Sequence, residues 1–96
     1  MDYKVVIDAG HGGEDSGASG NGIVEKNLTL QISEEMYRAF EEAGIPVKMT
    51  RTSDETVSPT ERVNRILEAF GNDKNVIVIS NHINAGGGDS HCVTNV

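Results

Sequence analysis

The stretch "VVIDAGHGGEDSG", from Val5 to Gly17, decides the fold expected of this chain. An apolar, β-branched run stops at Asp8, and His11 follows inside a cluster of glycines. Short β-branched runs are typical of strands that are buried on both faces. In open α/β sheets, ligands bind beyond the carboxyl ends of the strands. The stretch therefore predicts a buried strand over residues 3–9 that presents an imidazole at the rim of a sheet.

Two segments have the hydrophobic spacing of amphipathic helices. The first lies near residues 25–43, and Gly44 suits the left-handed backbone that commonly ends a helix. The second covers residues 59–70 and begins with a capping box, "SPTE", that has proline at the first helical position. We expect the apolar side chains of both helices to be buried against the sheet: Leu28, Ile32, Met36, Phe40, Val63, Ile66 and Phe70.

Two further strands are predicted over residues 45–51 and 75–80. The order β-α-β-α-β is typical of a mainly parallel central sheet with right-handed crossovers, so the fold class is α/β. The last stretch, "GGGDSHCVTNV", has weak periodicity, and we expect it to be irregular. The length of 96 residues suits one small domain.

Composition excludes several classes of partner. The formal net charge is −7, whereas sequence-independent nucleic-acid binding needs a basic face, so we expect neither nucleic acid nor an anionic membrane as a partner. No apolar run approaches the roughly 20 residues that span a bilayer. Cys92 is the only cysteine and can form no internal disulfide. The N-terminus leads directly into a predicted strand, so we expect no signal peptide.

Two histidines are predicted at the same rim of the sheet. His11 follows the first strand and His82 the third, and glycines flank both. Two imidazoles and one carboxylate can form an open catalytic zinc site, for which Glu14, Asp15 and Glu25 are candidates. A phosphate-binding loop is the alternative, but "GHGGEDSG" matches neither common glycine-rich phosphate motif and contains two acids.

Five stretches carry a family resemblance. They are "VVIDAGHGGEDSGASG", "EKNLTLQIS", "VKMTRTSDE", "ERVNRILEAF" and "VISNHINAGGG". In this order they resemble the motifs of zinc-dependent N-acetylmuramoyl-L-alanine amidases of the amidase-3 type, which are bacterial autolysins and phage endolysins. The resemblance covers about residues 3–88 and implies one Zn²⁺, with His11, Glu25 and His82 as its ligands. Asn84 and Ala85 match the family's "H-x-N-A" loop, which lines the site.

The resemblance implies hydrolysis of the amide between N-acetylmuramic acid and L-alanine of the peptidoglycan stem peptide. In the family a second glutamate, near the end of the domain, serves as general base. The chain stops at Val96, and its ending does not resemble that portion. We therefore expect residues 1–96 to be a catalytic domain that is incomplete at its C-terminus, lacks the base and has impaired activity.

Alternative functions follow from the same observation. The chain could be an inactive zinc- or muropeptide-binding fragment of an amidase, or a second chain or C-terminal segment could complete the domain. A nucleotide-binding α/β domain is the remotest class, and zinc stoichiometry would exclude it.

The expected place of action is the cell wall. Without a signal peptide, the protein would be released by lysis or through a phage holin, or would stay cytoplasmic as synthesised.

Overall fold

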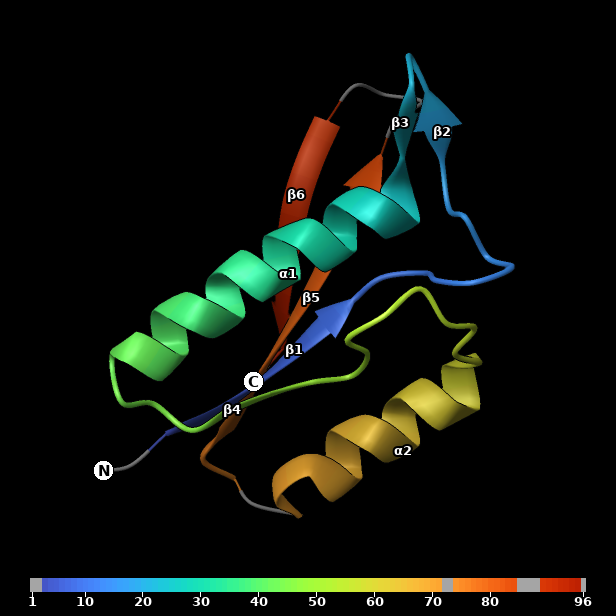
Figure 1. The fold of residues 1–96 in the computed structure, drawn as a ribbon. Coiled ribbons are helices and arrows are strands. Elements are labelled where there is room, and N and C mark those ends of the chain that lie inside the picture. Colours follow the sequence, from blue (N-terminus) through green and yellow to red (C-terminus); the bar gives the residue numbers. More distant parts are fainter. Residues whose placement is uncertain (1–2, 72–73, 85–88, 96) are drawn as a thin grey trace.

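A four-stranded sheet forms the centre of the molecule (Figure 1). The computed structural model describes residues 3–71, 74–84 and 89–95, with side chains described up to residue 83. The strand order is β4-β1-β5-β6, in which β1 is parallel to β4 and β5 while β6 is antiparallel to β5. The strands are β1 (Lys4–Ala9), β4 (Val47–Met49), β5 (Val76–Asn84) and β6 (Asp89–Asn95). The predicted α/β class with a mainly parallel sheet is confirmed.

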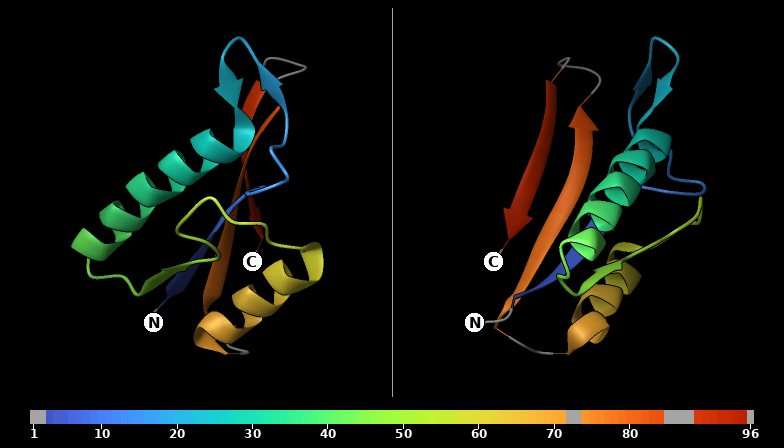
Figure 2. Two further views of the ribbon diagram at one scale, coloured as in Figure 1. Left: turned by 45° about the vertical axis from the view of Figure 1, so that its right-hand side comes forward. Right: turned by 60° about the vertical axis from the view of Figure 1, so that its left-hand side comes forward.

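The helices α1 (Glu25–Glu42) and α2 (Pro59–Phe70) cover opposite faces of the sheet (Figure 2). Neighbouring residues of β5 show this arrangement. The Asn81 amide donates to the Ser33 hydroxyl of α1, whereas Ser80 bonds to Asp8, which also contacts Arg62 of α2. Successive strand side chains point to opposite faces, so the sheet separates the two helices.

Local signals fix where the helices begin and end. At the start of α2 the Ser58 hydroxyl accepts a hydrogen bond from the Glu61 backbone N–H at 3.1 Å, and Pro59 occupies the first turn. Gly71 follows α2 with φ 74°, and Gly44 follows α1 with φ 77°, both in the left-handed region that favours glycine. The helix predicted over residues 59–70 is confirmed at both ends.

Two expectations for the strands are wrong, and a further pair of strands was not expected. The third strand was expected to end at Ser80, but β5 continues to Asn84, so His82 lies inside a strand. The stretch expected to be irregular contains β6, whose backbone pairs with β5 from the Val78–Asn95 pair to the Asn84–Asp89 pair. This pairing satisfies the backbone groups of β5 beyond its apolar run. A short hairpin, β2 (Ser19–Gly20) and β3 (Ile23–Val24), leads into α1 and was not predicted.

The buried core is smaller and more polar than the helical spacing predicts. Among the residues whose side chains are described, its apolar part consists of Val5, Val6, Ile7, Ala9 and Val57. The expectation that seven apolar helix residues are buried is wrong. Ile32 is 38% and Val63 54% exposed, and the other five, Leu28, Met36, Phe40, Ile66 and Phe70, are half-buried.

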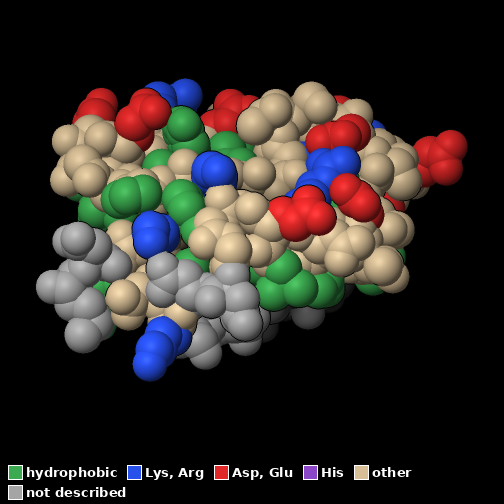
Figure 3. Space-filling model, turned by 90° about the horizontal axis from the view of Figure 1, so that it is seen from below, with side chains coloured by type: hydrophobic (Ala, Val, Ile, Leu, Met, Phe, Trp, Pro, Cys, Tyr) green, Lys and Arg blue, Asp and Glu red, His purple; other side chains and the backbone are tan. Residues whose placement is uncertain are grey.

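The side chains of α1 that are buried belong to Glu25, Thr29 and Ser33. This polar stripe faces the end of β1, where the Thr29 hydroxyl donates to the Gly10 carbonyl at 2.7 Å. The carbonyl groups at the end of β1 have no partner within the sheet and need hydrogen-bond donors. The face of α1 that carries Thr29 is therefore turned toward the sheet. Hydrophobic side chains consequently reach the surface and lie among charged ones in Figure 3. No helix in the described part of the chain is long and apolar enough to cross a membrane.

Candidate metal centre

The end of β1, the first turn of α1 and β5 bring His11, Glu25 and His82 together. One potential ligand atom from each lies within 4.8 Å of the others. Glu25 Oε2 is 3.0 Å from His11 Nε2 and 3.5 Å from His82 Nδ1, and the two rings are nearly perpendicular at 89°. Ligands about 2.0–2.1 Å from a tetrahedral zinc lie roughly 3.3–3.4 Å apart. The separations and the two-imidazole, one-carboxylate donor set therefore fit a zinc ion.

Glu25 is fixed by backbone hydrogen bonds on both carboxylate oxygens. Oε1 accepts from the Ala18 N–H and Oε2 from the Ile83 N–H, each at 2.9 Å. Burial by itself raises the pKa of Glu25, but these hydrogen bonds and the attraction of His11 and His82 outweigh it and lower the pKa below its ordinary value. Glu25 is therefore ionised near neutral pH, as a metal ligand must be.

Each imidazole has a second partner on its outer nitrogen. His11 Nδ1 lies 2.9 Å from Asp15 Oδ2, and His82 Nε2 lies 3.1 Å from Ser80 Oγ. The hydrogen bond to His11 lowers the pKa of Asp15, so Asp15 is an anionic acceptor. Histidines that bind metals usually hydrogen-bond through the nitrogen that does not face the metal, and both histidines have that environment here.

The glycines around His11 make room for the two imidazole rings. A Cβ on Gly10 would lie 2.6 Å from His82 Cε1, and one on Gly17 would lie 2.6 Å from His11 Cδ2. At these two positions the lack of a side chain makes room for the protein's own histidines. His11 itself has φ 64°, an uncommon backbone conformation for a residue with a side chain.

Two arginines whose roles could not be predicted from the sequence hold the loop that carries His11. Arg51 is 2% exposed and donates to the carbonyls of Ala9 (3.1 Å) and Gly10 (3.0 Å). Arg62, from the opposite face, donates to Ala9 (2.8 Å) and to His11 (3.0 Å). Together they bind the carbonyl groups that β1 leaves unpaired where it ends.

Asp8 links Arg62 to the sheet. Its carboxylate is 4% exposed, pairs with Arg62 at 2.6 Å and accepts hydroxyl hydrogen bonds from Thr50 at 2.8 Å and Ser80 at 2.7 Å. Burial raises the pKa of Asp8, but the bonds from Arg62, Ser80 and Thr50 outweigh it and lower the pKa. The sequence does contain a signal for this ion pair, because Asp8 lies within an apolar strand. A charge that is buried there needs a partner, since buried charges are almost always paired.

The structure separates the three candidates for the carboxylate ligand. Glu25 joins the two histidines, Asp15 contacts the far side of His11, and Glu14 is exposed, with its backbone N–H bonded to Thr56. Ala85 and Gly86 to Gly88 lie outside the described residues, and Asn84 is described only as the last residue of β5.

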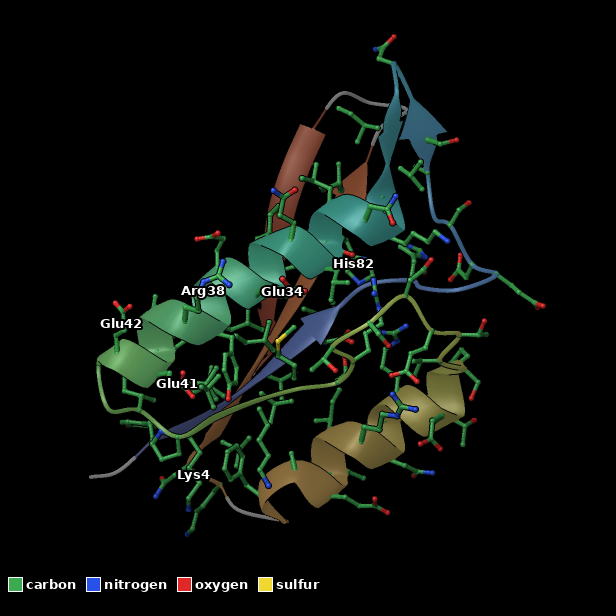
Figure 4. The ribbon with its side chains drawn as sticks, viewed as in Figure 1. Lys4, Glu34, Arg38, Glu41, Glu42 and His82 are labelled. Atoms are coloured by element: carbon green, nitrogen blue, oxygen red, sulfur yellow. The ribbon has the colours of Figure 1, made fainter. Side chains whose placement is uncertain are left out.

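A hollow of about 410 Å³ opens beside the histidines, between α2 and β5. Its wall combines the polar groups described above with apolar side chains: Asp8, His11, Asp15, Val57, Pro59, Arg62, Val63, Ile66, Val78, Ser80 and His82. A larger groove of about 590 Å³ lies between α1 and β4, and its lining includes Glu34 and Arg38, which Figure 4 labels on α1, but not His82. The hollow that contains both histidines is the one suited to the chemistry of a metal centre.

Comparison with known proteins assigns the family. The family model described as N-acetylmuramoyl-L-alanine amidase matches residues 5–94. The chain belongs to this amidase family. The match reaches six residues beyond the stretch in which the resemblance is evident from the sequence, and so it includes most of β6.

Two relatives and one solved structure show how far the likeness extends. The amidase CwlM of Bacillus licheniformis is 46% identical over 87 residues, covering 88% of this chain and 33% of the relative. The sporulation-specific amidase of Bacillus subtilis is 44% identical over 87 residues, covering 88% and 32%. The amidase AmiC2 of Nostoc punctiforme superposes with a TM-score of 0.74 at 35% identity, covering 85% of this chain and 44% of that one. The chain thus spans about a third of the length of these curated amidases.

Proposed function

We propose that this chain provides the zinc centre of a peptidoglycan amidase that cleaves the bond between N-acetylmuramic acid and L-alanine of the stem peptide. The observation that carries the proposal is the convergence of His11, Glu25 and His82 in a chain of the amidase family. When bound, zinc supplies Lewis acidity, which polarises a carbonyl and makes water acidic enough to act as a nucleophile near neutral pH. Three protein ligands are the number typical of catalytic zinc sites.

The ligand atoms in this proposal are His11 Nε2, Glu25 Oε2 and His82 Nδ1. Support comes from the hydrogen bonds on the opposite side of each group, to Asp15, Ala18 and Ser80. Side chains held in this way lose little freedom when a metal binds, so the centre is preorganised.

The hollow between α2 and β5 is the proposed place for the stem peptide and its sugar. Its apolar side chains, such as Val57 and Ile66, can contact the alanine and lactyl methyl groups. Asn84 and Ala85 are proposed to line the same region, on the strength of the family's "H-x-N-A" motif.

The general base is proposed to come from outside the described residues. Every carboxylate that lines the hollow there is already engaged: Asp8 by Arg62 and Asp15 by His11. Glu25 is held by two backbone groups and faces both histidines. None of the three is free to take a proton from water and pass it to the leaving amine. A base typically contributes a factor of about 10²–10⁴ to the rate, so residues 1–96 alone should be slow if residues 84–96 do not supply one.

This engagement of the carboxylates also favours a second candidate function. Residues 1–96 would then bind zinc and muropeptide without hydrolysing the amide. The two candidates share the metal centre and differ in whether a base is supplied by another segment or another chain.

Release of muropeptides from purified peptidoglycan separates the candidates. Residues 1–96 are tested alone and fused to the C-terminal part of the B. licheniformis relative, each with zinc or with chelator. Amide cleavage creates new amino groups on L-alanine without new reducing sugar ends. We expect zinc-dependent release by the fusion, its loss in the His82→Ala fusion, and much slower release by residues 1–96 alone.

Two results would contradict these proposals. A fusion that is folded and loaded with zinc yet inert on peptidoglycan would refute the amidase proposal in favour of binding. Fast, zinc-dependent cleavage by residues 1–96 would show that the base lies within them, and Glu14→Gln and Asp15→Asn would then identify it. Ser53→Ala, an exposed change away from the hollow, is the matched control for expression and folding.

A further inference from the structure

A row of polar side chains crosses the sheet and ends at His82. Asp8 of β1 lies directly opposite Ser80 of β5 in the parallel register, and the two side chains bond at 2.7 Å. His82 is two residues beyond Ser80 in the same strand, so both side chains leave the same face of the sheet. His82 Nε2 lies 3.1 Å from Ser80 Oγ, which makes Ser80 the link between Asp8 and the imidazole.

The hydrogen atoms in this row can be assigned from the donors and acceptors available. Asp8 is paired with Arg62 at 2.6 Å, so it is a carboxylate and can only accept. The single hydroxyl hydrogen of Ser80 must therefore point to Asp8 Oδ2. Ser80 Oγ can then only accept from His82, so the hydrogen between them belongs to Nε2. The other ring nitrogen, Nδ1, is the one 3.5 Å from Glu25 Oε2.

We propose that Ser80, oriented by Asp8 and Arg62, holds His82 in the Nε2–H tautomer and so presents an unprotonated Nδ1 to Glu25 before any metal binds. Ser80, Asp8 and Arg62 are positioning residues in this proposal, which rests on the proposed metal centre for its functional meaning. Their effect is to select the nitrogen that faces the centre, in addition to supporting the fold.

His11 is different in this respect. Its Nδ1 lies 2.9 Å from Asp15 Oδ2 and its Nε2 lies 3.0 Å from Glu25 Oε2, so both nitrogens face carboxylates. The groups on the two sides of His11 are of the same kind, so they do not select one tautomer. Ser80 thus selects the tautomer of His82, whereas the two carboxylates beside His11 make no such selection.

The test reads the tautomer of His82 directly. Nitrogen-15 chemical shifts of the imidazoles distinguish protonated from unprotonated ring nitrogens, and the His82→Gln variant assigns the signals. The metal-free chain is measured at an alkaline pH at which the imidazole shifts no longer change with pH, so that neutral tautomers are compared. We expect a protonated Nε2 with slow solvent exchange and an unprotonated Nδ1. A protonated Nδ1 in the folded, metal-free chain would overturn the proposal.

The Asp8→Asn variant should reverse the tautomer. With the amide oxygen retained toward Arg62 and Thr50, the amide NH₂ replaces Oδ2 and donates to Ser80. The hydroxyl hydrogen of Ser80 is then free to point at His82 Nε2, which must accept, so the hydrogen moves to Nδ1. Zinc affinity, measured with the metal alone, should fall about 10–100-fold, the usual effect of changing a partner of a metal ligand.

Ser80 itself supplies the second test, which does not depend on the folding of the Asp8 variant. Ser80→Ala should lose the slowly exchanging Nε2 hydrogen and weaken zinc binding, and Ser80→Thr, which keeps the hydroxyl, should restore both. Ser33→Ala removes a buried hydroxyl on the α1 side and serves as the control. Equal Nε2 exchange in Ser80→Ala and wild type would overturn the proposal. Because the tautomer is read without metal or substrate, a failed amidase assay leaves this result standing.

Discussion

Gly10→Ala should damage the metal centre while leaving the rest of the fold in place. Gly10 follows β1, and its φ lies outside the left-handed region, so its backbone accepts an alanine without strain. The added Cβ would lie 2.6 Å from His82 Cε1 and 2.7 Å from His82 Nδ1 and from the Asn81 carbonyl oxygen. The steric conflict therefore falls on a proposed ligand atom and on the strand that carries it.

The size of the effect follows from these distances. Carbon atoms pack best at about 3.5–4.0 Å, so the His82 ring must retreat by roughly 0.9 Å or turn away. Metal–ligand distances tolerate about 0.2 Å, so His82 would be displaced as a ligand. Zinc affinity should fall by more than the roughly 10–100-fold that follows loss of a partner of a ligand. Overpacking should lower the free energy of unfolding by about 1–3 kcal/mol.

Competition for zinc with a chromophoric chelator measures the affinity, and urea unfolding in chelator measures the metal-free stability. Gly20→Ala is the control, because a Cβ at Gly20 meets nothing within 4 Å and its φ is also outside the left-handed region. Gly20→Ala should bind zinc as the wild type does. Wild-type zinc affinity in Gly10→Ala would refute the placement of His82 against Gly10, and with it the assignment of Nδ1 as a ligand atom.

Three further predictions concern stability. Zinc at about 100 times its dissociation constant should raise the free energy of unfolding by about 2.7 kcal/mol, and His82→Ala should abolish the increase; an unchanged increase in that variant would exclude His82 as a ligand. Asp8→Asn removes the negative charge that pairs with Arg62 and should cost about 3–5 kcal/mol at pH 7 in urea unfolding. The pKa of Asp8 is lower in the folded than in the unfolded state, so its contribution to stability is present above the unfolded value of 3.8 and is lost as the pH falls further. The difference in the free energy of unfolding between wild type and Asp8→Asn should therefore become smaller in acid. A difference that does not change with pH would contradict this. Ser58→Ala removes the acceptor for the Glu61 N–H and should cost about 1 kcal/mol, measured in the same way, whereas no loss would show that the cap is not stabilising.

Features encoded by neighbouring residues could be predicted from the sequence. The bounds of α2 follow from the capping box at Ser58 and from Gly71, both of which act within one helical turn. The order of strands and helices follows from hydrophobic spacing. The extension of β5 past Ser80 could not be predicted in this way, because the residues 80–82 are polar and their strand conformation depends on pairing with β6.

The face of α1 that is buried could not be predicted from its hydrophobic spacing. The apolar repeat of α1 predicts that Ile32 is buried, but the stripe of Thr29 and Ser33 faces the sheet instead. Hydrophobic spacing does not record the unpaired carbonyls at the end of β1, which attract the Thr29 hydroxyl and the guanidinium groups of Arg51 and Arg62. Polar groups placed by tertiary contacts therefore overrode the apolar pattern.

The candidate site was predicted in part. The predicted strand order places His11 and His82 at one rim, but spacing left Glu14, Asp15 and Glu25 open as the third ligand. The difference between them depends on the hairpin β2–β3, which turns the chain so that Glu25 begins α1 beside both histidines. Such a choice depends on the path of a loop, which hydrophobic spacing does not encode.

Anomalous diffraction at the zinc edge from crystals of the zinc-loaded chain tests the central claim most directly. We predict one peak, about 2.0–2.2 Å from His11 Nε2, Glu25 Oε2 and His82 Nδ1. A peak bound to other residues, or none at these three side chains in the folded, zinc-treated protein, would contradict the claim that they form a zinc centre.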